Sequence, residues 1–310
     1  MGGSGVIYPG YCCMNLTLQN SLSIMTNRTM RRATFLEKGI QYASDIIVEN
    51  VSDLLRIVDW NGQNKIKNFR MSSNMFPWAS EYKLEDLPKW DKIKNTLLEI
   101  GSLAKEYDMR LSFHPGPFVK LASAKETVVH NSIKELEIHD SIMNHMGLQA
   151  SDFYPINIHV GMSYSEEVSD RFCAAYLRLS DTMQKRLVVE NDDKPASYSI
   201  SDLFLDIHSK INIPVTFDFF HHSLYNGRED WRLTEEEAFS MAGSTWKSIP
   251  LFHYSESKAL HESNNCNRTA HSDYINTLPT DYGEDIYLDI EAKAKELALI
   301  KVLQENMQCK

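Results

Sequence analysis

Six residues that can bind a metal ion or a phosphate group lie at, or just after, the ends of short β-rich segments spaced along the chain. Three are histidines and three are carboxylates: His114, His159, Glu190, Asp218, His253 and Glu291. A mixture of neutral imidazole and carboxylate ligands suits zinc, manganese or iron, whereas an all-oxygen set would favour magnesium or calcium. Because chance rarely repeats such residue types at six segment ends, the pattern predicts a divalent-metal site.

Two further histidines extend this set of candidate ligands. His221 follows closely on Asp218, and His271 precedes Asp273, which could orient the His271 ring through a hydrogen bond. A single histidine more often has a structural role than a ligating one. We therefore assign a structural role to the remaining histidines, which are His130, His139, His145, His208, His222 and His261.

The candidate ligands can meet only in a fold that brings the ends of many strands together. Short β-rich segments alternate with longer helical segments along the whole chain, which is typical of a parallel α/β fold. The predicted strands are residues 6–11, 69–72, 110–113, 156–159, 187–189, 214–217, 249–253 and 285–289. This number of strands favours a (β/α)8 TIM barrel, a single domain over residues 1–310, with the ligands on the carboxyl-terminal rim where this fold places catalytic groups.

Local signals predict some helix starts and one irregular region. Capping boxes of the S/T-x-x-E type, in which the side chains satisfy free N–H groups of the first turn, predict helix starts at Ser123, Ser163 and Thr234. Residues 255–285 are the least regular part of the sequence. They predict a long loop with one short helix.

The charge of the chain bears on its substrate. Lysine and arginine number 32 against 42 aspartate and glutamate residues, and the resulting net charge of −10 is unusual for a protein that binds DNA. A cluster of divalent ions would, however, add roughly four to six positive charges where the ligands gather. The acidic balance therefore does not exclude a nucleic-acid substrate.

Cysteine content and hydropathy predict the setting in which the protein works. The five cysteines are an odd number without a C-x-x-C pair, which predicts reduced thiols and no thiolate zinc site. No segment approaches the ~18 consecutive apolar residues of a membrane helix, and the amino terminus lacks the pattern of a signal peptide. We expect a soluble, intracellular, monomeric protein without a membrane partner.

Several short motifs occur in an order that resembles one known family. They are Met-Ser-Ser at 71–73, His-Pro-Gly at 114–116, Asn-Ile-His-Val-Gly at 157–161, Val-Glu-Asn-Asp-Asp at 189–193, Phe-Asp-Phe-Phe-His-His at 217–222 and Glu-Ala-Lys-Ala-Lys-Glu at 291–296. Together with Asn-Leu-Thr at 15–17 and Thr-Asn-Arg-Thr at 26–29, this set resembles the UV damage endonuclease family over almost the whole chain. That family belongs to the xylose-isomerase-like TIM barrels and is related to endonuclease IV.

The resemblance implies an activity and a set of site residues. The activity is metal-dependent hydrolysis of the DNA phosphodiester bond immediately 5′ to pyrimidine dimers and other lesions in double-stranded DNA, which initiates excision repair. The implied cofactor is two or three divalent ions, Mn²⁺ first, with Zn²⁺ and Mg²⁺ as alternatives. The matching ligands are His114, His159, Glu190, Asp218, His221, His253, His271 and Glu291. Among them we expect Glu190, Asp218 and Glu291 to be the catalytic carboxylates.

Two departures from the family pattern concern the metal site. Where the family commonly has a histidine in an Ala-Ser-His context, this sequence has Glu81, which could serve as an oxygen ligand. Two residues before His253, some members have a lysine close to the metals, but this sequence has Leu251. Leucine cannot bind a metal, so the resemblance implies an altered cluster.

A third departure concerns the recognition of damage. Family members have Gln-Tyr after the His-Pro-Gly motif, whereas this chain has Pro117 and Phe118. Phe118 keeps an aromatic face that can stack on or wedge between bases, but Pro117 has no side-chain amide. Tyr11 and Asn15 match other family residues that contact the lesion or its phosphate, and the position of Arg70 predicts a contact with the DNA backbone.

Two other functions remain open at this point. A metal-dependent sugar isomerase would use similar ligands in a small closed pocket and would convert ketoses. A member that has lost catalysis, through Leu251 and Pro117, would bind damaged DNA without cutting it.

Overall fold

A ring of parallel strands forms the centre of the molecule. The computed structural model describes residues 4–261 and 265–308. Within these ranges the strands are β1 (Ile7–Cys12), β2 (Asn68–Met71), β3 (Arg110–Phe113), β4 (Ile156–His159), β5 (Leu187–Glu190), β6 (Val215–Thr216), β7 (Leu251–Tyr254) and β8 (Ile286–Ile290). They form one 8-stranded sheet in the order β6-β5-β4-β3-β2-β1-β8-β7. The pairings between these neighbouring strands are parallel, as the sequence predicted.

The ring is completed between β6 and β7, which lie at the two ends of the strand order. A single parallel bridge joins Asp218 to His253, and the His253 backbone N–H donates to the carbonyl oxygen of Phe217 at 2.9 Å. Two candidate ligands therefore lie where the sheet closes. The predicted (β/α)8 barrel is confirmed as a nearly closed barrel.

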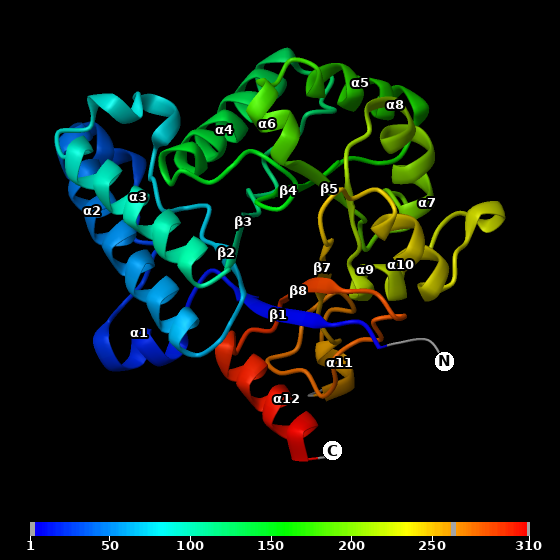
Figure 1. Cartoon of the computed structure of the whole chain (residues 1–310). Coiled ribbons are helices and arrows are strands. Elements are labelled where there is room, and N and C mark those ends of the chain that lie inside the picture. The colour runs from blue at the N-terminus through cyan, green and yellow to red at the C-terminus, as the bar shows by residue number, and fades with distance from the viewer. Residues whose placement is uncertain (1–3, 262–264, 309–310) are drawn as a thin grey trace.

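Helices surround the strands, as Figure 1 shows. The longer ones are α2 (Arg32–Gln63), α3 (Trp90–Glu106), α4 (Glu126–His145), α5 (Glu166–Tyr176), α10 (Glu235–Gly243) and α12 (Glu296–Gln308). The shorter ones are α1 (Leu16–Leu22), α6 (Asp181–Arg186), α7 (Ile200–Leu203), α8 (Ser209–Ile211), α9 (Phe219–Leu224), α11 (Lys258–His261) and the turns η1 (Ala79–Glu81), η2 (Leu84–Asp86), η3 (Phe204–His208) and η4 (Glu229–Trp231). None of the helices in the described ranges is long and apolar enough to cross a membrane.

The predicted strands agree with the observed ones to within a few residues. The largest difference is β7, which was predicted at 249–253 and runs from Leu251 to Tyr254. β6 has only two residues, Val215 and Thr216, instead of the predicted range 214–217. The strand ends early because Asp218 is the N-cap of α9, and its carboxylate accepts the backbone N–H of His221. The irregular region was also predicted correctly, since its described part contains only the short helix α11.

One of the three predicted capping boxes is present. The Thr234 hydroxyl accepts the backbone N–H of Glu237, and the Glu237 carboxylate accepts the Thr234 N–H, at the start of α10. The predictions at Ser123 and Ser163 are wrong. The Ser123 hydroxyl accepts the N–H of Lys125 in a turn before α4, and α5 is capped by Ser165, whose hydroxyl accepts the N–H of Val168. At α5 the nearer hydroxyl of Ser165 takes the cap position, whereas α4 begins after Lys125 without a side-chain cap.

The described cysteines have free thiols, in agreement with the sequence prediction. They are Cys12, Cys13, Cys173 and Cys266, while Cys309 lies outside the described residues.

Large side chains fill the amino-terminal end of the barrel. Arg110, at the start of β3, is fully buried and its guanidinium lies over the rings of Phe153, Trp246 and Tyr287 at 5.0, 5.3 and 4.9 Å. Leu251 packs in the same region against Trp246 and Tyr287. Leu251 is therefore part of an apolar floor beneath the ligands.

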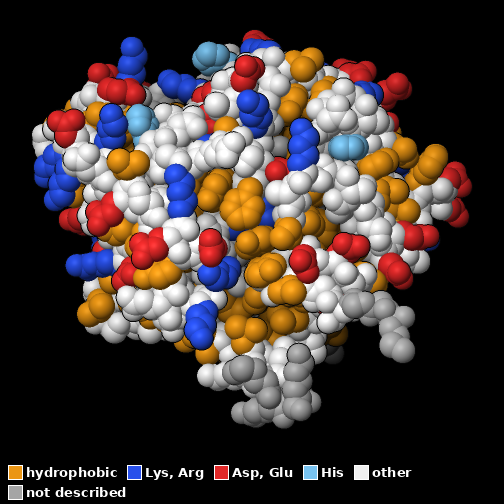
Figure 2. Space-filling model, in the orientation of Figure 1, with side chains coloured by type: hydrophobic (Ala, Val, Ile, Leu, Met, Phe, Trp, Pro, Cys, Tyr) orange, Lys and Arg blue, Asp and Glu red, His pale blue; other side chains and the backbone are white. Residues whose placement is uncertain are grey.

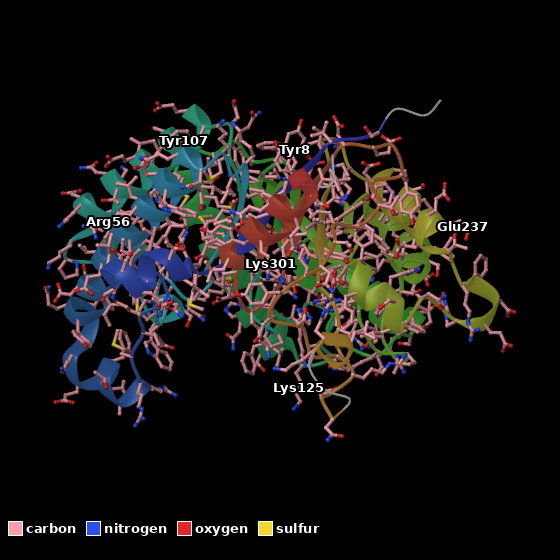
Figure 3. The ribbon with its side chains drawn as sticks, turned by 90° about the horizontal axis from the view of Figure 1, so that it is seen from below. Tyr8, Arg56, Tyr107, Lys125, Glu237 and Lys301 are labelled. Atoms are coloured by element: carbon pink, nitrogen blue, oxygen red, sulfur yellow. The ribbon has the colours of Figure 1, made fainter. Side chains whose placement is uncertain are left out.

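The two ends of the barrel can be followed in Figure 3. Tyr8 and Tyr107 lie on the amino-terminal side of the strands, and Lys125, which follows β3 and precedes α4, lies on the opposite side. Figure 2 shows acidic and basic side chains mixed over the face seen in Figure 1, with hydrophobic side chains gathered towards its middle. The acidic surplus of the chain does not form a single block on that face.

Candidate metal centre

The carboxyl-terminal rim of the barrel brings the predicted ligands together. In strand order from β3 to β8 they are His114, His159, Glu190, Asp218, His253 and Glu291. Parallel strands end on the same rim, which explains how residues so far apart in sequence converge. Their ligand atoms form three groups, each within 4.8 Å: His114–His159–Glu190, Glu190–Asp218–His221 and Asp218–His253–Glu291. Glu190 and Asp218 are each shared by two groups.

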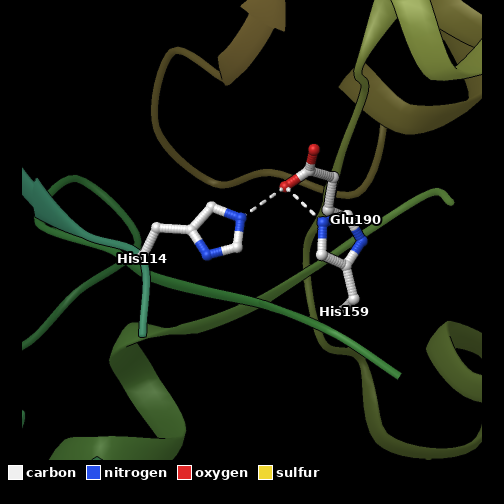
Figure 4. A group of neighbouring side chains, drawn as sticks. All are labelled: His114, His159 and Glu190. Carbon is white, nitrogen blue, oxygen red and sulfur yellow. Dashed lines mark hydrogen bonds and ion pairs between the residues drawn. The ribbon is translucent and has the colours of Figure 1, made fainter. Parts of the chain in front are cut away.

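Glu190 lies at the centre of this arrangement and is 1% exposed. Its Oε2 atom lies 3.0 Å from Nε2 of His114, 3.6 Å from Nε2 of His159 and 3.1 Å from Nδ1 of His253. The first two of these contacts are drawn in Figure 4. The side-chain amide of Asn157, two residues before His159 in the same strand, donates to the same oxygen.

Asp218 and His221 form the second part of the site. Asp218 is fully buried, and its Oδ1 accepts the backbone N–H of His221 at 2.8 Å. Its other oxygen, Oδ2, has no hydrogen-bond partner among the described residues. The His221 ring brings Nδ1 to 3.4 Å from Oε1 of Glu190.

Glu291 contacts His253 and His271 and also the partly buried Arg70. Its Oε1 lies 3.3 Å from Nδ1 of His253 and 2.6 Å from Arg70 at the end of β2. Nδ1 of His271 lies 3.6 Å from Oε2 of Glu291 and contacts its backbone oxygen at 3.1 Å. His271 thus lies beside the cluster, and its ring is oriented by a backbone oxygen instead of the predicted Asp273.

Burial and the mutual attraction of these groups shift their pKa values. Burial opposes ionisation of Glu190, but His253, His159 and His114 outweigh it and hold its pKa well below the usual range. Burial likewise opposes charge on His221 and His253, but the surrounding carboxylates raise the pKa of each to about 9. Burial, with the nearby charges of Glu190 and Glu291, raises the pKa of Asp218 to about 6.

The donor set fits divalent ions. Several carboxylates and imidazoles are buried together within coordinating distance of one another, and Oδ2 of Asp218 lacks a partner inside the described structure. Buried carboxylates that lack a hydrogen-bond partner are costly unless a cation compensates them. The mixed nitrogen and oxygen donors match manganese or zinc better than calcium.

Three of the predicted site residues lie elsewhere. Glu81 is exposed in η1 and belongs to none of the three ligand groups.

Tyr11 and Asn15, which were predicted to contact the lesion, are both fully buried. The Asn15 amide donates to the Tyr11 hydroxyl at 2.8 Å, and that hydroxyl donates to Asn61 at 2.6 Å. In this conformation Tyr11 and Asn15 hold the end of β1 against α2 and present no surface to DNA.

The other predicted DNA-contacting residues line or border a cleft at the rim. The cleft has a volume of about 680 Å³, and its walls include Arg70, His114, Pro117, Lys120, His159 and Glu291. Phe118, next to Pro117 in the loop after β3, is 90% exposed. The cleft therefore contains several candidate ligands, and the loop that forms part of its wall also carries an exposed aromatic ring.

Two carboxylates near the ligands were missed from the sequence. Oδ1 of Asp192 lies 3.8 Å from Nδ1 of His159, and Oδ2 of Asp289 lies 3.6 Å from Nε2 of His253. Asp289 could have been found, because it is two residues before Glu291 in a strand and so shares the inward face. Asp192 lies in a loop, where no such periodicity applies.

Comparison with known proteins identifies relatives over nearly the whole chain. The family model described as UV-endonuclease UvdE matches residues 8–310. A UV-damage endonuclease of Schizosaccharomyces pombe is 35% identical over 306 residues, which cover 94% of this chain and 49% of that protein. The chain thus spans about half the length of that relative.

Solved structures give the same result at the level of the fold. The crystal structure of SacUVDE is 30% identical with a TM-score of 0.83, and the match covers 98% of this chain and 99% of that one. Endonuclease IV from Thermus thermophilus, at 13% identity and a TM-score of 0.52 over 83% of this chain and 95% of that one, shares the barrel fold. The resemblance inferred from the motifs is confirmed, and the chain belongs to the UV-endonuclease UvdE family.

Proposed function

We propose that this protein is a divalent-metal-dependent endonuclease that hydrolyses the DNA phosphodiester bond immediately 5′ to pyrimidine dimers and other lesions, and so initiates excision repair. The observation that carries the proposal is the set of three ligand groups joined by Glu190 and Asp218 on the barrel rim. Such a cluster offers ligands for two or three ions, with Mn²⁺ as the first candidate and Zn²⁺ or Mg²⁺ as alternatives. We further propose a monomer that acts on damaged double-stranded DNA.

Some residues of the chain would bind the ions, and Arg70 would supply positive charge to the phosphate. His114, His159, His221 and His253 would supply nitrogen ligands, and the catalytic carboxylates Glu190, Asp218 and Glu291 would supply oxygen ligands. When bound, the ions lower the pKa of a coordinated water and neutralise charge on the scissile phosphate. Arg70, held 2.6 Å from Glu291, adds a fixed positive charge to the wall of the cleft that a phosphate would enter.

Phe118 is the residue best placed to detect damage. An exposed aromatic ring on a loop of the cleft wall can wedge into a base stack, and damaged bases are easier to unstack because they pair and stack poorly. Proline at position 117 holds the loop without adding a hydrogen-bonding side chain. Selectivity would then depend on the distortion of the duplex and not on the sequence of bases.

Replacement of Phe118 by alanine is expected to weaken binding to UV-damaged duplex by roughly 10- to 100-fold, because stacking on one base contributes about 1–3 kcal/mol. Affinity for Mn²⁺ is expected to stay the same, since the ring lies outside the ligand groups. Fluorescence anisotropy with damaged and intact duplexes measures the first effect. Leu177→Ala is the matched control, because Leu177 is also apolar and 67% exposed but lies after α5. An equal loss in both variants would contradict a specific role of Phe118.

The proposed activity is tested by nicking of supercoiled plasmid. We expect UV-irradiated plasmid to be nicked in Mn²⁺ while intact plasmid is not, and EDTA to stop the reaction. Mapping the new ends on an oligonucleotide with one dimer tests incision on the 5′ side. Equal nicking of intact and irradiated plasmid would contradict damage recognition. Conversion of ketoses without nicking would indicate an isomerase, and binding to damaged duplex without nicking in any metal would indicate a member that has lost catalysis.

A further inference from the structure

Three histidines of the metal centre have Nδ1 held by a backbone oxygen. Nδ1 contacts the carbonyl of Pro115 at 3.2 Å in His114, of Asn191 at 2.9 Å in His221 and of Glu291 at 3.1 Å in His271. A ring nitrogen that donates to an oxygen carries the proton, which leaves the other nitrogen free to bind a metal. In these rings Nε2 is the nitrogen left to face the cluster, and in His114 it lies 3.0 Å from Oε2 of Glu190.

His253 has the opposite orientation. Its Nδ1 faces the cluster, 3.1 Å from Glu190 and 3.3 Å from Glu291, so Nε2 points away from it. Beside Nε2 lies the carboxylate of Asp289, whose Oδ2 is 3.6 Å away. His253 and Asp289 are direct partners in the register of β7 and β8, so both side chains lie on the inner face of the barrel.

Asp289 is a buried carboxylate with one oxygen fixed and one oxygen available. It is fully buried, and its Oδ1 accepts the side-chain N–H of Asn68 from β2 at 2.8 Å. Its Oδ2 has no hydrogen-bond partner among the residues that the structure describes. A buried carboxylate oxygen is costly when unpaired, and Nε2 of His253 faces this one at 3.6 Å, from where a small shift of the ring would complete a hydrogen bond.

We propose that Asp289 is a positioning residue of the metal centre, which accepts the Nε2–H of His253 and thereby keeps Nδ1 of that ring available for a divalent ion. This inference rests on the proposed metal-dependent function. Asn68 anchors the Asp289 carboxylate, Asp289 orients the imidazole, and the imidazole meets Glu190 and Glu291 at the rim. Asp289 touches neither substrate nor ion in this arrangement.

The Asp289→Asn variant tests the proposal, because asparagine keeps the size of the side chain but cannot accept hydrogen bonds through both terminal atoms. Partners that orient ligating histidines typically change metal affinity by about 10- to 100-fold when they are replaced. We therefore expect isothermal titration with Mn²⁺ alone to show affinity lower by that factor, while circular dichroism shows a folded protein. In Zn²⁺-loaded protein, NMR should show an exchange-protected Nε2–H signal of His253 in the parent that is lost or shifted in the variant.

Two further variants keep the test informative. Asp152 is also a buried aspartate, but it accepts the backbone N–H of Lys247 at 2.7 Å, and its backbone oxygen binds Arg110 at the opposite end of the barrel. Asp152→Asn is therefore expected to lower thermal stability without changing Mn²⁺ affinity. Asn68→Ala removes the anchor of Asp289 and is expected to weaken Mn²⁺ binding by a smaller factor than Asp289→Asn.

The outcomes separate this inference from the proposed function. Unchanged Mn²⁺ affinity and an unchanged His253 signal in Asp289→Asn would overturn the role of Asp289 while the metal centre stands. Equal losses in Asp289→Asn and Asp152→Asn would also overturn it, because both would then be effects of general destabilisation. A parent protein that binds no Mn²⁺ would overturn the metal centre and the role of Asp289 together.

Discussion

The Glu190→Gln variant is expected to nick UV-irradiated DNA roughly 10³-fold more slowly than the parent protein. The carboxylate belongs to two ligand groups and contacts His114 and His253 through the same oxygen. Glutamine keeps the shape but removes the charge that would hold ions and balance the imidazoles. Loss of a metal-assisted step removes several kcal/mol of transition-state stabilisation, and each 1.4 kcal/mol is about tenfold in rate.

Initial rates in saturating Mn²⁺, measured beside equilibrium binding of Mn²⁺, check this expectation. The matched control is Glu296→Gln, because Glu296 is also a fully buried glutamate but accepts backbone N–H groups of Leu16 and Thr17 at the start of α1. That control should lose stability and keep Mn²⁺ binding. Nicking by Glu190→Gln within about tenfold of the parent would show that the shared carboxylate is not catalytic.

The positions of the ligands could be predicted because they depend on information that is local in sequence. His159 and Glu190 end short β-rich segments, and the parallel barrel turns every such end towards one rim. The fold itself follows from the same alternation of segments. Even the short strand β6 was predicted, but its end was placed one residue too late. Asp218 caps the next helix and so ends the strand, and a hydrophobic pattern does not reveal such a cap.

Contacts that depend on the register between two strands, or on how deeply a side chain is buried, could not be predicted in the same way. The orientation of His253 depends on Asp289, which becomes its partner only through the register of β7 and β8. Tyr11 and Asn15 were expected to contact DNA from their motif alone, but their depth is set by packing against α2, and both are buried. Glu81 was expected to replace a histidine ligand, but the η1 turn leaves it exposed. How deeply a side chain is buried depends on how the surrounding helices and strands pack, and a local motif does not contain that information.

Metal affinity is expected to rise steeply with pH between about 6.5 and 8.5. In the metal-free protein the pKa values of His221 and His253 are raised to about 9, so both rings are charged at pH 7. A metal ion binds only neutral imidazole, so binding must release these protons. With two protons released, the apparent affinity rises by up to ~100-fold for each pH unit and levels off near pH 9.

The same pKa values predict an opposite trend for the stability of the metal-free protein. Because folding raises the pKa of both histidines, their ion pairs contribute stability fully below about pH 6.5, and this contribution is lost as the pH rises through about 9. The pKa of Glu190 is lowered on folding, so its contribution is lost at the acidic end instead. The metal-free protein is therefore expected to melt at a lower temperature at pH 8.5 than at pH 6.5.

Titration calorimetry in buffers of different protonation enthalpy counts the released protons directly. We expect close to two protons per protein at pH 7, and about one in His221→Asn, whose remaining charged ring is His253. His222→Asn is the control, because His222 is adjacent in sequence but lies outside the ligand groups, and burial lowers its pKa. A proton count near zero, or an affinity that does not change between pH 6.5 and 8.5, would mean that His221 and His253 are neutral before the metal binds. The negative charge of Glu190 would then have to be compensated by a group other than these two rings.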